Sequence, residues 1–159
     1  THPNGRREVV EFTPRQIKNL YDVRWLLENR ALELLFENGP SVYPELAQIL
    51  GEIERKSNAE AKDTDFCDLD IAFHRALVRA ADNLFLTNAW AGSAQMHYSM
   101  MKFNVLTDYG PRYAREFFEK HYNLYEMLLS GNKAAFPELR RHIMEAKEIA
   151  VSVMKTIKH

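Results

Sequence analysis

Apolar residues recur every three or four positions along most of this chain, which is the spacing of one face of an α-helix. Polar and turn-forming residues interrupt the pattern at five places, so it predicts six helical segments. No stretch of alternating apolar and polar residues suggests a strand. The interruptions lie at Asn38-Gly39-Pro40, around Ser57, at Asp82-Asn83, at Tyr109-Gly110-Pro111 and at Ser130-Gly131-Asn132.

The first helix has a clear start signal. Thr13 is suited to cap a helix, Pro14 suits the first helical position, and Gln16 is placed to complete a capping box. Residues 1–12 are polar and then briefly β-prone, so we interpret them as an arm or linker. The sequence therefore predicts an all-α fold over residues 13–159, an antiparallel bundle of about six helices.

Composition narrows the class of protein. With 159 residues the chain suits one domain, and its net charge of −1 gives no electrostatic reason to expect nucleic-acid binding. No apolar run approaches the ~18 residues that span a bilayer. The single cysteine, Cys67, excludes an internal disulfide and is typical of a reducing cytoplasm. We expect a cytoplasmic protein without membrane contact.

Four unusual residues lie on the apolar stripes of three predicted helices. Charged and imidazole side chains seldom face a helical core unless a partner is present there. Asp70 and His74 are four residues apart, so they lie one turn apart on one helix face. We name the four residues the Asp–His cluster: Asp70, His74, His121 and His142.

The last two histidines flank one predicted turn, ten residues before and eleven residues after Gly131. Equidistant positions in an antiparallel helical hairpin lie at the same level, so these imidazoles are expected to face each other. Three imidazoles and one carboxylate suit a divalent metal, zinc first, with nickel, manganese or iron as alternatives. Such a set leaves coordination positions open to a ligand in an internal cavity. Alternatively, each histidine is a hydrogen-bonded core residue, and Asp70 caps a helix or pairs with an arginine.

Three further residues are candidates for ligand binding. Arg24 lies on the apolar stripe of the first helix, where it either clamps an anion or pairs with Glu28 one turn on. His97 lies on the inward stripe of the fourth helix and either lines the cavity or packs in the core. Asn83 either caps the fourth helix or orients a metal ligand.

Common catalytic motifs are absent from the sequence. It contains no His-Glu-x-x-His of zinc proteases and no Glu-x-x-His of di-iron bundles. A glycine-rich phosphate loop and the motifs of serine and cysteine nucleophiles are also missing. We therefore expect that the chain is not an enzyme.

The residues around the cluster resemble a known family. Residues 68–77, followed by 80–84, resemble the D-x-x-F-H…A-x-x-N signature of the FCD ligand-binding domain, and residues 22–28 are similar to its opening V-R-x-x-L-E helix. His121 and His142 match the family's last two histidine positions. The FCD domain is the C-terminal effector domain of the FadR branch of GntR-type bacterial transcription regulators. The resemblance runs from about residue 18 to residue 155.

The resemblance implies that the Asp–His cluster binds a divalent metal, which helps to hold a small carboxylate effector. We expect a homodimer that affects DNA binding through a winged helix-turn-helix domain. No such domain fits into residues 1–12, so we expect it to be absent from this chain. Two alternatives remain: a small helical metalloenzyme that uses an open metal position, and a structural module that a metal stabilises.

Overall fold

The computed structural model describes residues 12–39, 41–59, 64–105 and 112–157 of the chain. Helices account for nearly all of these residues, and no strand occurs among them. The all-α prediction with six helices is therefore confirmed. The helices are α1 (Pro14–Asn38), α2 (Pro44–Asn58), α3 (Thr64–Ala80), α4 (Leu84–Val105), α5 (Arg112–Leu129) and α6 (Ala135–Ile157).

Local signals explain where the helices begin and end. At the start of α1 the Thr13 hydroxyl accepts from the backbone N–H of Gln16 at 3.2 Å, and Gln16 Oε1 accepts from the backbone N–H of Thr13 at 2.8 Å. This is the predicted capping box.

Two features predicted from the sequence lie outside the described residues. They are the N-terminal arm, apart from Phe12, and the break at Tyr109-Gly110-Pro111.

The turn between α5 and α6 is defined by hydrogen bonds. Gly131 has a φ of 64°, a left-handed conformation that glycine adopts without strain. Its N–H donates to Leu128 O at 3.2 Å, and the Asn132 N–H donates to Met127 O at 2.8 Å. This pair of bonds is a Schellman motif, which ends a helix and satisfies its last carbonyls. The turn fixes the register of the two helices that follow and precede it.

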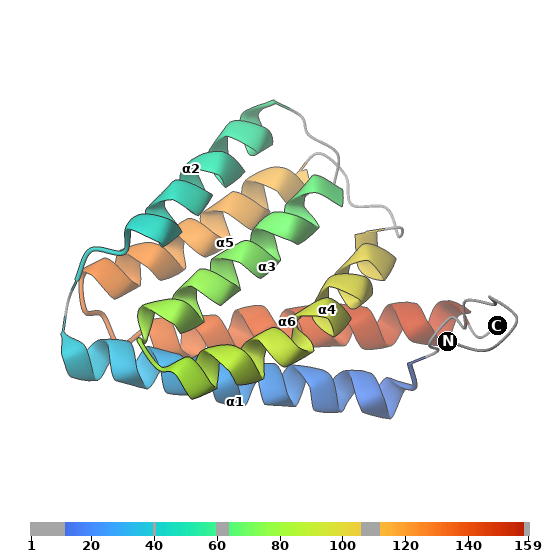
Figure 1. Cartoon of the computed structure of the whole chain (residues 1–159). Coiled ribbons are helices and arrows are strands. Elements are labelled where there is room, and N and C mark those ends of the chain that lie inside the picture. Colours follow the sequence, from blue (N-terminus) through green and yellow to red (C-terminus); the bar gives the residue numbers. More distant parts are fainter. Residues whose placement is uncertain (1–11, 40, 60–63, 106–111, 158–159) are drawn as a thin grey trace, which may run out of the picture.

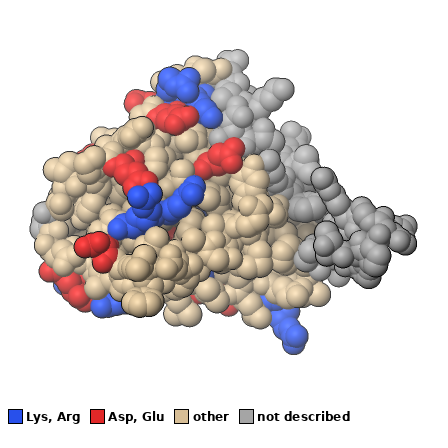
Figure 2. All heavy atoms as spheres, viewed as in Figure 1, with Lys and Arg blue, Asp and Glu red and all other residues tan. Residues whose placement is uncertain are grey.

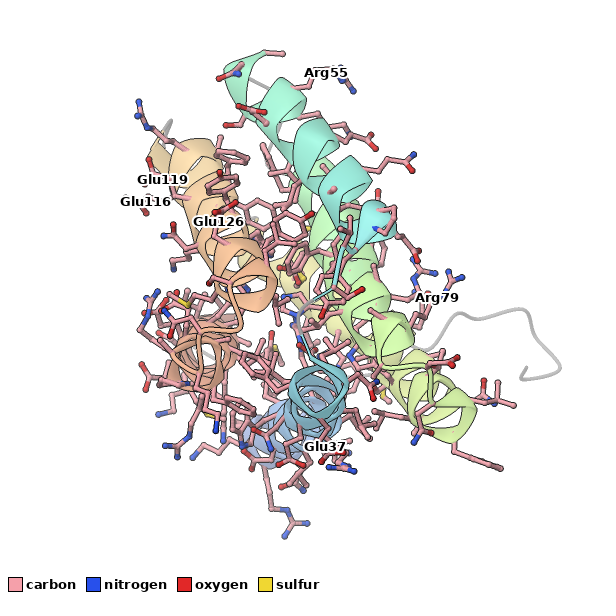
Figure 3. All side chains as sticks on the ribbon, turned by 90° about the vertical axis from the view of Figure 1, so that its left-hand side faces the viewer. Glu37, Arg55, Arg79, Glu116, Glu119 and Glu126 are labelled. Atoms are coloured by element: carbon pink, nitrogen blue, oxygen red, sulfur yellow. The ribbon has the colours of Figure 1, made fainter. Side chains whose placement is uncertain are left out.

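The six helices form two groups. In Figure 1, α1 and α6 run side by side along the bottom of the view, α2, α3 and α5 are stacked above them, and α4 crosses in front. The contacts agree: α1 packs on α3, α4 and α6, and α5 packs on α2 and α6. Figure 3 shows the labelled charged side chains pointing away from the bundle, among them Glu37, Arg55 and Glu119.

Burial mostly follows the predicted stripes, with two corrections. On α1 the helical spacing of the apolar residues predicts that Leu27 is buried, but Leu27 is only partly buried and the buried face runs through Tyr21, Arg24, Glu28 and Leu32. On α6 the helical spacing predicts that Ile149 is buried with His142 and Ala146, and this is wrong, since the Ile149 side chain is 38% exposed. The physical reason is packing: neighbouring helices cover a face that is offset from the one that the spacing predicts.

Among the described helices, none is both long and apolar enough to cross a membrane.

We predict that Leu32→Ala lowers the free energy of unfolding by about 2–5 kcal/mol, because it removes fully buried methyl groups and leaves a cavity. Urea unfolding followed by circular dichroism measures the change. Val42→Ala is the matched control, since Val42 is 74% exposed and its loss should cost little. Equal losses in both variants would contradict the assignment of the core.

Candidate metal centre

Three helices bring the Asp–His cluster together. Asp70 and His74 lie one turn apart on α3, and the α5–α6 hairpin supplies His121 and His142. The rings of His121 and His142 are in edge contact, with centroids 4.7 Å apart, as their distances from Gly131 predicted. Phe117 and Phe73 pack against the His121 ring, with centroids 4.2 and 4.8 Å away, and restrict its orientation.

The potential donor atoms of the cluster converge on one point. Asp70 Oδ1 lies 3.1 Å from His121 Nε2 and 3.6 Å from the Nε2 atoms of both His74 and His142. The Nε2 atoms of His74 and His142 are 3.3 Å apart. All four residues offer a ligand atom within 4.8 Å of one another. One carboxylate oxygen and three imidazole nitrogens therefore surround a common centre.

These separations fit the donor set of a metal ion. Two donors that each lie about 2.1 Å from an ion are roughly 3.0 Å apart at a right angle and roughly 3.4 Å apart at the tetrahedral angle. The four separations given above lie between 3.1 and 3.6 Å, so they overlap this range and exceed its upper end by about 0.2 Å. Imidazole nitrogen and carboxylate oxygen are also the donors that zinc, nickel, manganese and iron accept.

Hydrogen bonds at the far side of two rings fix which nitrogen faces the centre. His74 Nδ1 lies 2.5 Å from Glu28 Oε2, and His121 Nδ1 lies 2.7 Å from the carbonyl oxygen of Phe117. A carbonyl and an ionised carboxylate only accept, so each Nδ1 carries the proton. In the neutral imidazole the Nε2 lone pair is then free to bind a metal. Partners of this kind usually support metal-bound histidines.

A buried ionic network lies behind the cluster. Arg24 Nε donates to Glu28 Oε1 at 2.8 Å, and Arg24 Nη2 donates to Asp70 Oδ2 at 3.2 Å. Trp90 Nε1 also donates to Glu28 Oε1, at 2.9 Å. The side chains of Arg24, Glu28 and Asp70 are at most 4% exposed, so each charge depends on its partners rather than on water.

This network keeps both carboxylates ionised. Burial alone would raise the pKa of Asp70, but the charges of Arg24 and of His74 in its protonated form, together with the polar contacts of His121 and His142, hold it well below its usual range. Burial opposes ionisation of Glu28 too, yet His74, Arg24 and the Trp90 hydrogen bond lower its pKa to about 2. Asp70 is therefore available as an anionic ligand at neutral pH.

Two histidines of the cluster differ in their affinity for protons. Burial and the Arg24 charge oppose protonation of His74, but the carboxylates of Glu28 and Asp70 outweigh them and raise its pKa above the ordinary 6.5. Burial and the neighbouring histidines lower the pKa of His142 to about 3, against the opposing effect of Asp70. His142 is therefore neutral at neutral pH, whereas protons compete with a metal for His74.

The three candidate ligand-binding residues lie in different settings. Arg24 is buried and pairs with Glu28, as one alternative predicted, and also with Asp70. Asn83 Oδ1 accepts from the backbone N–H of Leu86 at 3.0 Å, so it caps α4. His97 is fully buried against the Tyr21 ring, and neither of its ring nitrogens has a hydrogen-bond partner within the described part of the chain. Their binding of a ligand stays a prediction.

Two functional contacts were missed by the sequence analysis. Glu28 was considered only as a partner of Arg24, and Trp90 was given no role at the site, yet both belong to the network behind His74. A signal for Glu28 was present: it lies four residues after Arg24 and four before Leu32, on the face that is buried. An acidic residue between a buried arginine position and a leucine indicates a second buried partner.

Comparison with known proteins identifies relatives of this arrangement. The model of the FCD domain family matches residues 19–146, which is most of the chain. Among curated proteins, no sequence matches the chain significantly.

Two solved structures share the fold. The metal-free FCD domain of a candidate transcriptional regulator is 21% identical, with a TM-score of 0.73, and the match covers 91% of this chain and 98% of that one. A candidate GntR transcriptional regulator from Rhodococcus sp. RHA1 is also 21% identical, with a TM-score of 0.62. That match covers 88% of this chain but 66% of the Rhodococcus chain, so a third of the larger protein has no counterpart here.

We predict that the purified chain binds close to one divalent metal ion and that His121→Ala or His142→Ala removes most of the binding, since each imidazole supplies one bond. Metal content after dialysis, measured by mass spectrometry, is the test. Tyr122→Ala is the control on α5, because Tyr122 is exposed beside His121. Full occupancy in either histidine variant would exclude this ligand set.

Acidification from neutral pH should also release the metal, because the raised pKa of His74 favours the protonated imidazole, which cannot bind a metal through that nitrogen.

We also predict that Glu28→Gln weakens metal binding about 10–100-fold, as loss of a carboxylate behind a metal-bound histidine commonly does. The amide has one acceptor oxygen, whereas Glu28 accepts from His74, Arg24 and Trp90. Competition with a chromogenic chelator measures the affinity. Glu33→Gln on the same helix removes an exposed ion pair with Arg30 and should bind metal like the wild type. Equal affinity in both variants would mean that Glu28 does not support His74.

Proposed function

This chain belongs to the FCD domain family, and on that premise we propose that it is the effector-sensing domain of a GntR/FadR-type transcription regulator. In this proposal the Asp–His cluster binds a divalent metal, for which zinc is the first candidate. A small carboxylate metabolite then occupies the open coordination positions of the ion. Binding changes the DNA affinity of a winged helix-turn-helix domain that lies outside this chain.

The observation that carries the proposal is the convergence of four donor atoms in a buried site with the separations of a metal-ligand set. In a core without such a role, three imidazoles around one carboxylate oxygen would be costly, because each buried polar group needs its own partner. When bound, the ion would supply a positive charge and open positions for oxygen ligands. The protein's own groups hold those positions in place.

Charge balance favours an anionic effector. The site buries one positive side chain, Arg24, and two negative ones, Glu28 and Asp70, so with neutral histidines it has one negative charge in excess. A divalent ion changes this excess to one positive charge. Since unbalanced buried charge is costly, one further anion is stabilising there. A single carboxylate restores neutrality, which supports the class of effector that the family resemblance implies.

The surroundings suggest how such an effector is held. His142 is the most accessible member of the cluster, with 11% of its side chain exposed against 4% or less for the others, so we propose that the effector enters on its side. Burial and the Arg24 charge lower the pKa of His97 to about 3, so its neutral ring offers one donor and one acceptor. We propose that His97 hydrogen-bonds an effector oxygen. Arg24 acts there mainly by orienting Asp70, and Asn83 by fixing the start of α4.

We predict that small monocarboxylates raise the melting temperature of the metal-loaded chain and leave the metal-stripped chain unchanged. At a ligand concentration ~100 times the dissociation constant, mass action stabilises the folded state by roughly 2.7 kcal/mol. A panel of carboxylates in differential scanning fluorimetry measures the shift. Neutral amides of the same acids are the control, because they keep the shape and lose the charge.

The same experiment separates the alternatives. Equal shifts with and without metal would mean that carboxylates bind elsewhere, and the absence of any shift across the panel would contradict the sensor. Consumption of a carboxylate by the metal-loaded chain, followed by NMR, would favour the metalloenzyme. His97→Phe, which keeps a buried ring and removes both nitrogens, should reduce the response to carboxylates without loss of metal.

A further inference from the structure

A hollow of about 410 Å³ opens at the end of the bundle where α1 leads into α2. The last turns of α1 and α3 and the first turn of α2 surround it, and it shares no residue with the Asp–His cluster or with the network behind that cluster. Its volume is that of a small-molecule site. Leu35 and Ala76, both at most 3% exposed, form apolar parts of its wall. The hollow is therefore a second candidate site for a ligand.

Tyr43 is the side chain that distinguishes this hollow from an ordinary surface groove. It also lines a smaller hollow of about 270 Å³ beside the α5–α6 turn, so the two hollows meet at this residue. Only 8% of Tyr43 is exposed, yet its hydroxyl has no hydrogen-bond partner in the described part of the chain. A hydroxyl on a buried residue normally has such a partner. A ligand in the hollow would supply it.

The start of α2 and Arg79 give the hollow a positive side. Tyr43 holds the capping position of α2, but its side chain accepts no hydrogen bond from the helix. Among the described residues, the N–H groups of Glu45 and Leu46 therefore lack a capping acceptor, and they carry the positive end of the helix dipole. Arg79 on α3 lines the same hollow, and its Nη1 donates to Glu45 Oε1 at 3.1 Å. Its other N–H groups remain available to an acceptor.

The end of α1 and Glu45 give the hollow a negative side. Of the terminal carbonyls of α1, from Leu35 to Asn38, only that of Phe36 accepts a backbone hydrogen bond within the described chain, from Gly39 at 3.3 Å. The remaining carbonyls carry the negative end of the helix dipole. The Glu45 carboxylate adds a full negative charge at the same hollow.

These charges favour a zwitterion over a simple ion. A simple anion would be repelled by Glu45 and by the α1 carbonyls, and a simple cation would be repelled by Arg79 and by the start of α2. Since Arg79 and Glu45 are in contact, a small molecule with both charges close together can reach both side chains. Their side chains are 55% and 50% exposed, so the pair contributes little to stability and can rearrange around a ligand. On the left of Figure 2, where α2 and α3 approach the end of α1 in Figure 1, basic and acidic side chains lie beside one another.

We propose that this hollow binds a small α-amino acid with an aliphatic side chain. Its carboxylate accepts from Arg79 and from the first turn of α2, and its ammonium group donates to Glu45 and to the terminal carbonyls of α1. The Tyr43 hydroxyl hydrogen-bonds the ligand, while Leu35 and Ala76 contact its side chain. The bound amino acid joins the ends of α1 and α3, the two helices that are also joined by the network behind the Asp–His cluster.

Calorimetric titration of the chain with L-leucine tests the proposal. L-leucine should bind at one site per chain. Isocaproate and isopentylamine are the matched controls, because they are leucine without its ammonium group and leucine without its carboxylate. Each should bind about tenfold more weakly than L-leucine or less, since each loses one charge-assisted set of hydrogen bonds. The absence of L-leucine binding would overturn the proposal, and so would equal binding of either control.

Variants of the wall test the position of the site. Arg79→Gln and Glu45→Gln should each weaken binding of L-leucine about tenfold, because each removes a charge that the ligand contacts. Arg55→Gln and Glu52→Gln are the matched controls, since these residues form an exposed ion pair on α2 outside the hollow, and both should bind like the wild type. Tyr43→Phe should weaken binding about threefold to tenfold through loss of one hydrogen bond, with an unchanged circular dichroism spectrum. Unchanged affinity in Arg79→Gln and Glu45→Gln, or an equal loss in their controls, would contradict the assignment of the hollow.

Removal of metal separates this site from the Asp–His cluster. An α-amino acid can also bind a divalent ion through its amino nitrogen and a carboxylate oxygen. The titration is therefore repeated after dialysis against a chelator, and the affinity for L-leucine should be unchanged. Binding that disappears with the metal would place L-leucine at the cluster and overturn the second site. Because the expected result needs no metal, it is independent of the proposed sensor function.

Discussion

The ionic contact of Arg24 with Glu28 and Asp70 is the interaction on which the site depends. Two carboxylates buried without a cation would take up protons or open the core. With Arg24 between them, both remain ionised, and each keeps an oxygen for a second task. Asp70 directs Oδ1 to the histidines and Glu28 directs Oε2 to His74. One guanidinium group therefore fixes two acceptors in separate helices.

Features set by neighbours in the sequence were predictable. The capping box at Thr13 and the turn at Gly131 depend on residues within one turn, so they determined the ends of α1 and α5 before any packing was known. The approach of His121 to His142 was predictable for the same reason, because a short turn fixes which residues of a hairpin lie at one level. The placement of α3 beside this hairpin was inferred only from the chemistry of Asp70 and His74.

Features set by long-range packing were not predictable. Leu27 and Glu28 are adjacent in sequence, and hydrophobicity favours Leu27 for the core, yet Glu28 is the buried one. Its burial depends on His74 and Trp90, which come from helices tens of residues away and supply the compensating hydrogen bonds. Ile149 shows the converse: its spacing is suited to the core, but the neighbouring helices leave it exposed. A single helical period cannot reveal which face its neighbours will cover.

Two polar contacts between α1 and α3, from Arg24 to Asp70 and from Glu28 to His74, lie near the middle of α1. Because of this position, a tilt of α1 about these contacts moves its N-terminal end. Pro14 lies 14 residues before Glu28, about 21 Å along the helix axis at ~1.5 Å per residue. A tilt of about 5° at Glu28 would move the start of α1 by roughly 2 Å. If Asp70 and His74 hold an ion as proposed, a small change in that contact would be enlarged at the N-terminal end of α1.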